Sequence, residues 1–124
     1  IPSAHFGLNF DPSHFELQFI EPASALHEFK GRLFHLHAKD VRIYRERLNQ
    51  AGIFALPLEW HQPRIPGYGG IDWAGFMSVL QETGYNGPVC IEIEDDTFGR
   101  TLEGRKRALR TARNFLAPFF PRTS

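Results

Sequence analysis

Three side chains that could hold a metal ion lie far apart in this sequence: Asp11, His37 and Glu92. Carboxylate oxygens and imidazole nitrogens are common ligands of divalent ions such as Mn²⁺, Mg²⁺, Co²⁺ and Zn²⁺. The same groups suit proton transfer, because a carboxylate can accept a proton while a bound ion polarises substrate oxygens. Such chemistry needs all three groups at one point, so the elements that contain them must converge.

Each of the three residues falls near the C-terminal end of a predicted β-strand. Successive side chains of a strand point to opposite faces, and segments 5–11, 32–39 and 88–94 each place apolar residues on one face and polar residues on the other. The polar faces contain Asn9 and Asp11, then His35, His37 and Lys39, then Cys90, Glu92 and Glu94. Because parallel strands are usually apolar on both faces, polar groups at the same ends indicate a site.

Helices are predicted between and after the strands, over residues 22–30, 73–83 and 101–119. Pro22 suits a first helical position, and Asp72 is a suitable N-cap residue. Alternation of strands and helices predicts an α/β fold with a parallel sheet. The C-terminal edge of such a sheet is the usual place of an active site. Segment 41–70 is predicted as a long loop, of the kind that forms lids, binding segments or disordered stretches, and its first part, 44–50, could be a helical turn.

Length, composition and charge exclude several classes of protein. The chain has 124 residues, of which 42% are hydrophobic, and this predicts one domain over 1–124 with a modest core. The 14 basic and 14 acidic residues balance, which argues against nucleic acid or a membrane surface as the main partner. The sequence has neither a long apolar run nor signal-peptide features, so we expect a cytoplasmic protein. Its one cysteine, Cys90, is predicted to be a small core residue.

Five motifs in chain order support a family resemblance. They are Asp11-Pro-Ser-His14, His35-Leu-His37-Ala-Lys39-Asp40, Arg64-Ile-Pro-Gly-Tyr-Gly-Gly-Ile-Asp72-Trp73, Gly84-Tyr-Asn-Gly-Pro-Val and Ile91-Glu92-Ile-Glu94-Asp95. With them the sequence resembles the C-terminal part of the xylose-isomerase-like TIM barrels, the group of sugar-phosphate isomerases and epimerases to which the family-2 abasic-site endonucleases are more distantly related. The resemblance implies a partial (β/α)8 barrel, made of its three C-terminal βα units.

The resemblance also implies that the chain is incomplete on its own. A closed barrel has eight strands and about 250 residues, so three units would leave open sheet edges. We therefore expect a fragment of a longer barrel, or a chain that needs a second copy of itself or a complementary chain.

The resemblance assigns roles to particular residues. Asp11, His37 and Glu92 would hold one divalent ion, either Mn, Mg, Co or Zn, and Glu92 would also move the proton during isomerisation or epimerisation of a sugar or sugar phosphate through an ene-diolate. By the same resemblance, His14 matches a histidine that either contacts substrate or is a further ligand. The positions of Lys39, on the same strand face as His37, and of Arg64, in the glycine-rich stretch, add two more candidates for binding the small carbohydrate substrate. In the family, a further Glu ligand comes from a strand that precedes this segment, which puts the activity of the chain alone in question.

Structural interpretations exist beside these roles. Asp11 could cap the turn that follows it, His35 could be a core histidine, and Glu92 and Glu94 could form ion pairs with nearby cations. A non-catalytic half-barrel that assembles with itself or a partner is the alternative function. A metal-dependent abasic-site endonuclease is a weaker one, because no Asp-x-His motif follows residue 40 and the net charge is zero.

Overall fold

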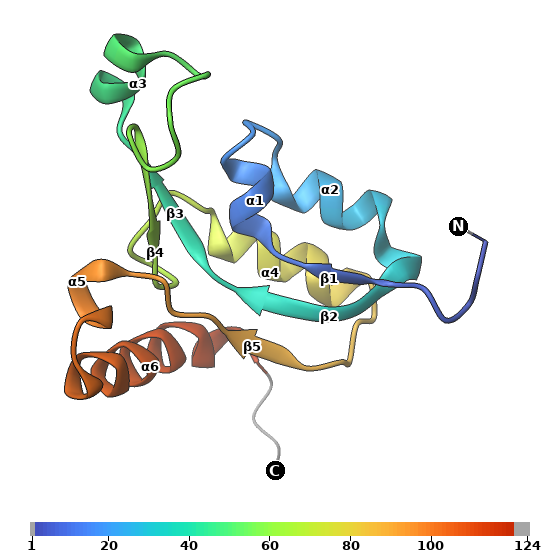
Figure 1. Ribbon diagram of the computed structural model, residues 1–124. Helices are drawn as coiled ribbons and strands as arrows, with labels where there is room; N and C mark the ends of the chain where they lie inside the picture. The colour runs from blue at the N-terminus through green and yellow to red at the C-terminus, as the bar shows by residue number, and fades with distance from the viewer. Residues whose placement is uncertain (1, 121–124) are drawn as a thin grey trace.

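A parallel three-stranded sheet forms the centre of the molecule. The computed structural model describes residues 2–120. In it β1 (Leu8–Phe10), β2 (Leu33–Ala38) and β5 (Val89–Ile91) form the sheet in the order β1-β2-β5 (Figure 1). The expected α/β class with parallel strands is therefore confirmed.

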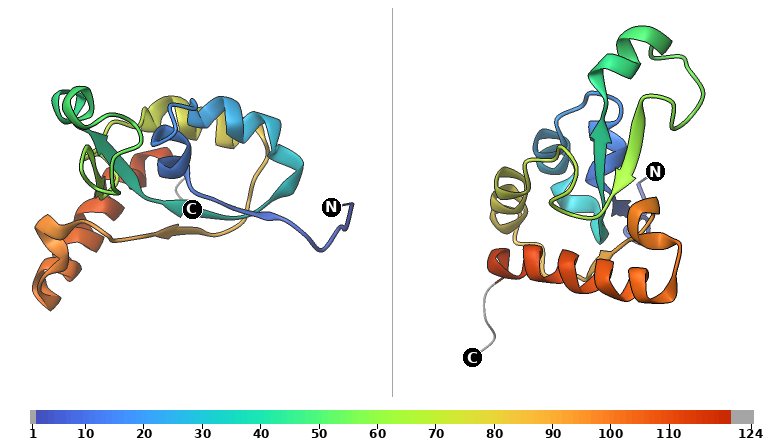
Figure 2. Two further views of the ribbon diagram at one scale, coloured as in Figure 1. Left: turned by 45° about the horizontal axis from the view of Figure 1, so that its top comes forward. Right: turned by 90° about the vertical axis from the view of Figure 1, so that its left-hand side faces the viewer.

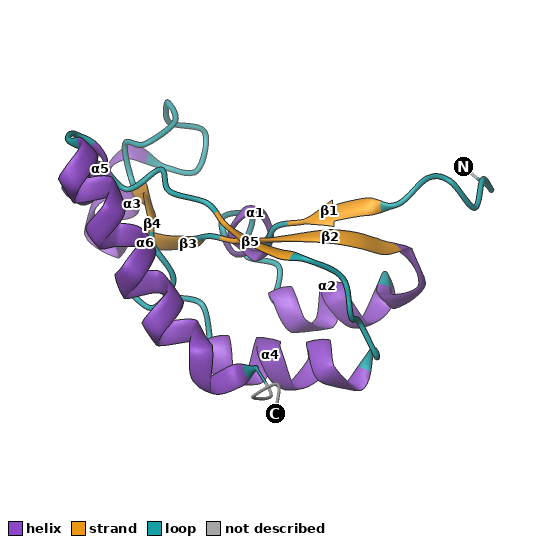
Figure 3. Cartoon of the chain, turned by 90° about the horizontal axis from the view of Figure 1, so that it is seen from below, coloured by secondary structure: helices purple, strands orange, loops and turns teal. Residues whose placement is uncertain are grey.

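Three helices lie on one side of this sheet (Figure 3): α2 (Pro22–Glu28), α4 (Trp73–Glu82) and α6 (Leu102–Leu116). Each predicted helix is present, although Lys30–Arg32 and Ala117–Phe119 are 3₁₀ turns. Asp72 caps α4 as predicted, since its side chain accepts a hydrogen bond from the Gly75 N–H. Within residues 2–120, no helix is both long enough and apolar enough to span a bilayer.

The core lies between the sheet and these helices. Phe10, Leu36 and Ala38 point from the strands toward Leu26 of α2 and Phe76 of α4, and each of the five is at most 2% exposed. Burying a large apolar side chain stabilises a fold by about 1.5–3 kcal/mol. The apolar face of each strand is thereby fixed against the helices, which turns the polar face away from them.

The opposite face of the sheet is open in the part of the chain described here (Figure 2). His35 and His37 of β2 are partly exposed there, and Cys90 of β5 is exposed. The expectation of a buried Cys90 is therefore wrong for the described residues. The interpretation of His35 as a core histidine stays untested, because residues 2–120 provide no second layer of structure over this face.

The segment predicted as a loop over 41–70 contains regular structure. β3 (Asp40–Ile43) pairs antiparallel with β4 (His61–Arg64), and α3 (Arg45–Ala51) lies between them. The helical turn suggested for 44–50 is therefore present, whereas the prediction of a loop is wrong for the two strands. Pro63 is the reason that the second strand is not predicted, because proline argues against a strand in the middle of a sheet. A two-stranded ribbon consists of edge strands, and these tolerate proline.

The outer strands are shorter than predicted. β5 ends at Ile91, and Glu92 follows it with a backbone hydrogen bond of 3.3 Å to the Ala38 carbonyl oxygen. β1 spans three residues, and Asp11 is the N-cap of the short helix α1 (Pro12–Glu16), where only a turn was predicted. A second short helix, α5 (Asp96–Gly99), follows β5.

Asp40 is the buried residue that joins the hairpin to the rest of the fold. Its side chain is 1% exposed. Oδ1 accepts hydrogen bonds from the backbone N–H groups of Val41 (2.8 Å) and Ile71 (3.2 Å), and Oδ2 accepts from the Gly67 N–H (3.0 Å) and the Trp73 indole (2.8 Å). The segment after β4 therefore wraps around one carboxylate, so closely that a side chain at position 69 would collide with it.

Replacing Asp40 by asparagine is expected to lower the free energy of unfolding by about 2–4 kcal/mol, because the amide NH₂ would face N–H donors in a buried site. Urea denaturation of wild type and variant measures this. Asp72→Asn is the matched control, since asparagine is also a good N-cap and the residue is exposed; it should change stability by a few tenths of a kcal/mol. Equal effects of the two changes would contradict the role of Asp40.

Candidate active site

Asp11, His37 and Glu92 come together at the C-terminal ends of β1, β2 and β5. One ligand atom from each lies within 4.8 Å of those of the other two, and the His37 Nδ1 lies 2.8 Å from Glu92 Oε2. The parallel register pairs His37 with Cys90, which sets Glu92 just past the end of β2. Three residues separated by up to 81 positions in the sequence thus face one point.

The Asp11 carboxylate has two separate functions in the structure. Its Oδ1 accepts hydrogen bonds from the Ser13 N–H (2.9 Å) and hydroxyl (2.7 Å), which caps α1. Its Oδ2 faces the cluster, 3.1 Å from the Lys39 ammonium. The capping interpretation and the site interpretation of this residue are therefore compatible, and the cap fixes the direction of the free oxygen.

Lys39 lies among the carboxylates, with its side chain only 6% exposed. Its Nζ is 3.1 Å from Asp11 Oδ2, 3.3 Å from Glu92 Oε2 and 3.0 Å from Glu94 Oε2. Burial by itself would lower the pKa of Lys39, but the hydrogen bond to Glu94 and the charges of Asp11 and Glu92 outweigh it, so the pKa is raised above its usual 10.5. Lys39 therefore stays an ammonium ion.

The cluster has the composition and charge of a divalent-metal site. Two carboxylates and an imidazole are the donor types that Mn²⁺, Co²⁺ and Zn²⁺ accept. The three carboxylates of Asp11, Glu92 and Glu94 exceed the single ammonium by two charges, so one divalent ion would neutralise the group. The residues present thus fit a metal.

The other predicted substrate-binding residues lie differently. His14 of α1 is at the rim of the cluster, with its Nε2 3.5 Å from Asp11 Oδ2 and its side chain 65% exposed. Arg64 contacts other groups: its Nε is 3.0 Å from the fully buried Asp95, and its guanidinium lies over the Tyr68 ring. The structure thus brings His14 to the cluster, whereas the contacts of Arg64 lie outside it.

His61 of β4 is a residue that the sequence prediction missed. A cavity of about 170 Å³ beside the cluster is lined by His61 together with His14, Lys39 and Glu94. The His61 Nε2 accepts a hydrogen bond from the Leu58 N–H (3.3 Å), and among the described residues its buried Nδ1 has no hydrogen-bond partner. Because residue 61 fell in a predicted loop, no strand phase pointed to it; only the pairing of His61 with Ile43 places it here.

Taken together, these observations describe a segment of an α/β fold with a cluster of potential metal ligands at the C-terminal edge of its strands. The chain belongs to the xylose isomerase-like TIM barrel family, whose pattern matches residues 1–119. It is 35% identical over 101 residues to the uncharacterized protein YfiH of Bacillus subtilis (strain 168), covering 74% of this chain and 32% of that protein.

The chain is also similar to enzymes with named activities. An inosose dehydratase of Lacticaseibacillus casei is 31% identical over 91 residues, which cover 72% of this chain and 30% of the relative. A 3-dehydroshikimate dehydratase of Pseudomonas putida is 37% identical over 78 residues, or 60% of this chain and 12% of the relative. The chain spans about a third or less of the curated relatives it matches.

A solved structure has the same fold. The crystal structure of a xylose isomerase domain protein from Planctomyces limnophilus superposes with a TM-score of 0.70 at 24% identity, covering 94% of this chain and 38% of that one. The expected partial barrel is therefore confirmed.

Removing the Lys39 ammonium is expected to destabilise the chain when no metal ion is bound. Lys39→Met leaves the buried Asp11 carboxylate without its ion-pair partner and should lower the free energy of unfolding by about 3 kcal/mol. Added Mn²⁺ should restore much of the loss, since it replaces the missing charge. Thermal or urea unfolding with and without Mn²⁺ measures both effects. Lys106→Met, at an exposed pair with Glu103, should change stability by less than about 1 kcal/mol; similar losses for both variants would refute the assignment.

His61 is expected to titrate below the ordinary histidine value of 6.5, because burial disfavours its charged form and lowers its pKa. Between that lowered pKa and 6.5, the unfolded chain binds more protons than the folded one at this site, so stability decreases as the pH falls through this window. An NMR titration of the six imidazoles, assigned with His61→Gln, gives the midpoint. A His61 midpoint at or above 6.5 would contradict the burial argument.

Proposed function

We propose that this chain forms the metal-binding end of a divalent-metal-dependent isomerase or epimerase that acts on a small sugar or sugar phosphate. The main support is the convergence of Asp11, His37 and Glu92, with the Lys39 ammonium beside the two carboxylates. The family membership and the named sugar-like substrate of the inosose dehydratase relatives agree with it.

In this proposal, Asp11, His37 and Glu92 hold one ion, which could be Mn²⁺, Mg²⁺, Co²⁺ or Zn²⁺. When bound, the ion acts as a Lewis acid toward the substrate oxygens and so acidifies the neighbouring C–H group. Glu92 takes up or returns the proton on Oε2, the oxygen that lies 2.8 Å from His37 Nδ1 and 3.3 Å from the Lys39 ammonium.

Lys39 and His14 stabilise and bind the substrate in this proposal. The ammonium donates hydrogen bonds and stabilises the negative charge that develops on the ene-diolate oxygen. Glu94 gives Lys39 a partner throughout, at 3.0 Å. His14, at the exposed rim, contacts substrate hydroxyl groups. Arg64, whose contacts are with Asp95 and Tyr68, would contact substrate only through a movement of its segment.

The activity of the whole protein needs more of the barrel than this segment. Within residues 2–120, β1 and β5 each pair with β2 alone, which leaves their outer edges available. We propose that the remaining strands of a barrel, from a longer chain, a second copy or a complementary chain, cover these edges and the open face. The alternative, a non-catalytic half-barrel, predicts assembly without metal binding. Solution mass and metal content by plasma mass spectrometry distinguish the two.

Glu92→Gln tests the proton-transfer role. Wild type, assembled with the remaining strands of the barrel and supplied with Mn²⁺, Mg²⁺ or Co²⁺, is expected to exchange the proton next to the carbonyl of a small ketose or inosose in D₂O, detected by NMR. The variant in the same assembly is expected to exchange at least about 100-fold more slowly. Glu103→Gln, an exposed glutamate in a surface ion pair of α6, is the matched control and should match wild type.

Metal binding is measured on the same samples, by Mn²⁺ electron paramagnetic resonance. Loss of exchange with Mn²⁺ still bound would assign Glu92 to proton transfer, whereas loss of both would assign it to the metal alone. Full exchange activity in Glu92→Gln would refute the proton-transfer role. Absence of Mn²⁺ binding by wild type would refute the proposed function.

A further inference from the structure

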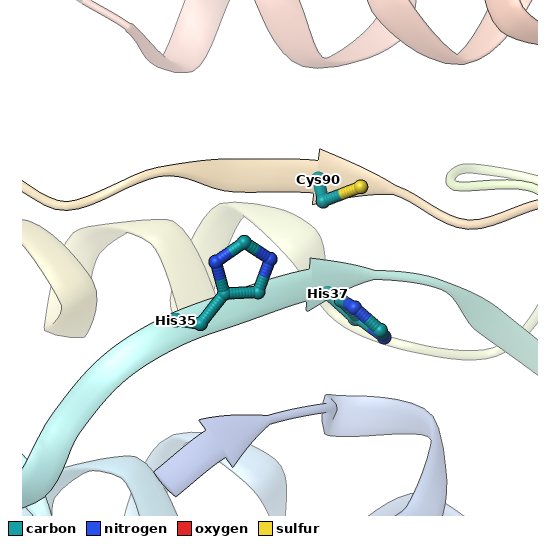
Figure 4. Close-up of side chains that lie close together, drawn as sticks. All are labelled: His35, His37 and Cys90. Carbon is teal, nitrogen blue, oxygen red and sulfur yellow. The ribbon is translucent and has the colours of Figure 1, made fainter. Parts of the chain in front are cut away.

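A second group of potential ligands lies on the open face of the sheet. His35 and His37 of β2 and Cys90 of β5 each offer a ligand atom within 4.8 Å of the other two. Figure 4 shows the three side chains on the same face of the sheet, with the His35 ring between β2 and β5. The placement follows from the register, because His37 is paired with Cys90 and His35 is two residues earlier on the same face.

We propose that His35, His37 and Cys90 form a second metal site, distinct in chemistry from the carboxylate cluster, which takes a thiophilic divalent ion such as Zn²⁺. Two imidazoles and one thiolate form a nitrogen and sulfur donor set that suits Zn²⁺ or Co²⁺ and does not suit Mg²⁺. A fourth position stays available for water, as three-ligand zinc sites allow.

The geometry needs only side-chain adjustment to reach coordination. Zn–N and Zn–S bonds of about 2.0–2.3 Å place neighbouring ligand atoms of a tetrahedral site roughly 3.5 Å apart. The two imidazole rings already lie edge to face with centroids 5.4 Å apart. The Cys90 thiol has a weak contact of 3.9 Å to the Ile91 carbonyl oxygen, so little opposes its rotation toward an ion.

Access also favours binding at this face. Within residues 2–120, Cys90 is exposed and both histidines are partly exposed, so an ion can enter this segment from solvent before the strands that we propose to cover the open face are in place. The Zn²⁺ ion would displace the thiol proton on binding, which goes to solvent.

The two ligand groups share His37, and this makes them competitors. One imidazole binds one ion unless it also loses its second ring proton, so a Zn²⁺ ion at His35 and Cys90 removes His37 from Asp11 and Glu92. This second step depends on the proposed function of the carboxylate cluster, whereas the existence of the thiolate site does not. A thiophilic ion at the open face is therefore expected to displace Mn²⁺ from the carboxylate cluster.

Co²⁺ binding to the reduced chain tests the site directly. Wild type is expected to develop the near-ultraviolet charge-transfer absorption of a cobalt–thiolate bond, and Zn²⁺ is expected to abolish it by competition. Cys90→Ser should lack the band, and His35→Gln should bind Co²⁺ about tenfold or more weakly. Asp11→Asn, which leaves His35, His37 and Cys90 unchanged, should keep the band. Circular dichroism confirms that each variant is folded.

Absence of the band in wild type, or an equal Co²⁺ affinity in wild type and Cys90→Ser, would overturn the thiolate site. For competition, Zn²⁺ should release Mn²⁺ from wild type at a concentration at least about tenfold lower than from Cys90→Ser; equal release would overturn the shared use of His37. A cobalt–thiolate band in a chain that binds no Mn²⁺ would retain the thiolate site and refute the proposed function.

Discussion

The charges buried at the end of β2 are the constraint on which the rest of the structure depends. Lys39 and Asp40 are consecutive and both nearly inaccessible, and a buried charge without partners costs several kcal/mol. Lys39 is compensated by carboxylates from the ends of β1 and β5. Asp40 is compensated by N–H donors from the hairpin, the following segment and α4. These two requirements fix the ends of three strands and the course of the chain from β4 to α4 relative to one another.

The same compensation shapes the chemistry of the cluster. Without a metal, Lys39 separates carboxylates that would otherwise repel each other, and an entering divalent ion would in turn repel Lys39. Glu94 resolves this conflict, because it lies 3.0 Å from the ammonium and is half exposed. In the proposed metal-bound state, Lys39 would stay paired with Glu94 while Asp11 and Glu92 would hold the ion. The ammonium would then lie beside the proposed substrate position, where a fixed positive charge would stabilise an anionic intermediate.

The sequence predicts those parts of the fold and site that depend on strand phase. Leu36 and His37 were assigned to opposite faces by alternation alone, and the convergence of Asp11, His37 and Glu92 follows once the strands are parallel. Alternation contains no information about what covers each face, so it does not predict that Cys90 is exposed in the described segment. The structural role of Asp40 cannot be predicted from the sequence, because its hydrogen-bond donors lie up to 33 residues away and are mostly backbone groups. The strand that positions His61 is not predicted either, because it contains Pro63.

Because both ligand groups contain His37, the ion that binds there depends on the carboxylate cluster and on the group of His35 and Cys90 together. Zn²⁺ binds most nitrogen and sulfur donors more tightly than Mn²⁺ or Mg²⁺ does, so the histidines and Cys90 alone would favour zinc. The two excess negative charges of the carboxylate cluster reduce this preference for zinc. They attract every divalent ion, and carboxylate oxygens do not favour a soft ion over a hard one. Covering the open face would bury Cys90 and raise the cost of its thiolate. Any element that covers this face would thereby shift the preference of His37 toward the carboxylates and the harder ion.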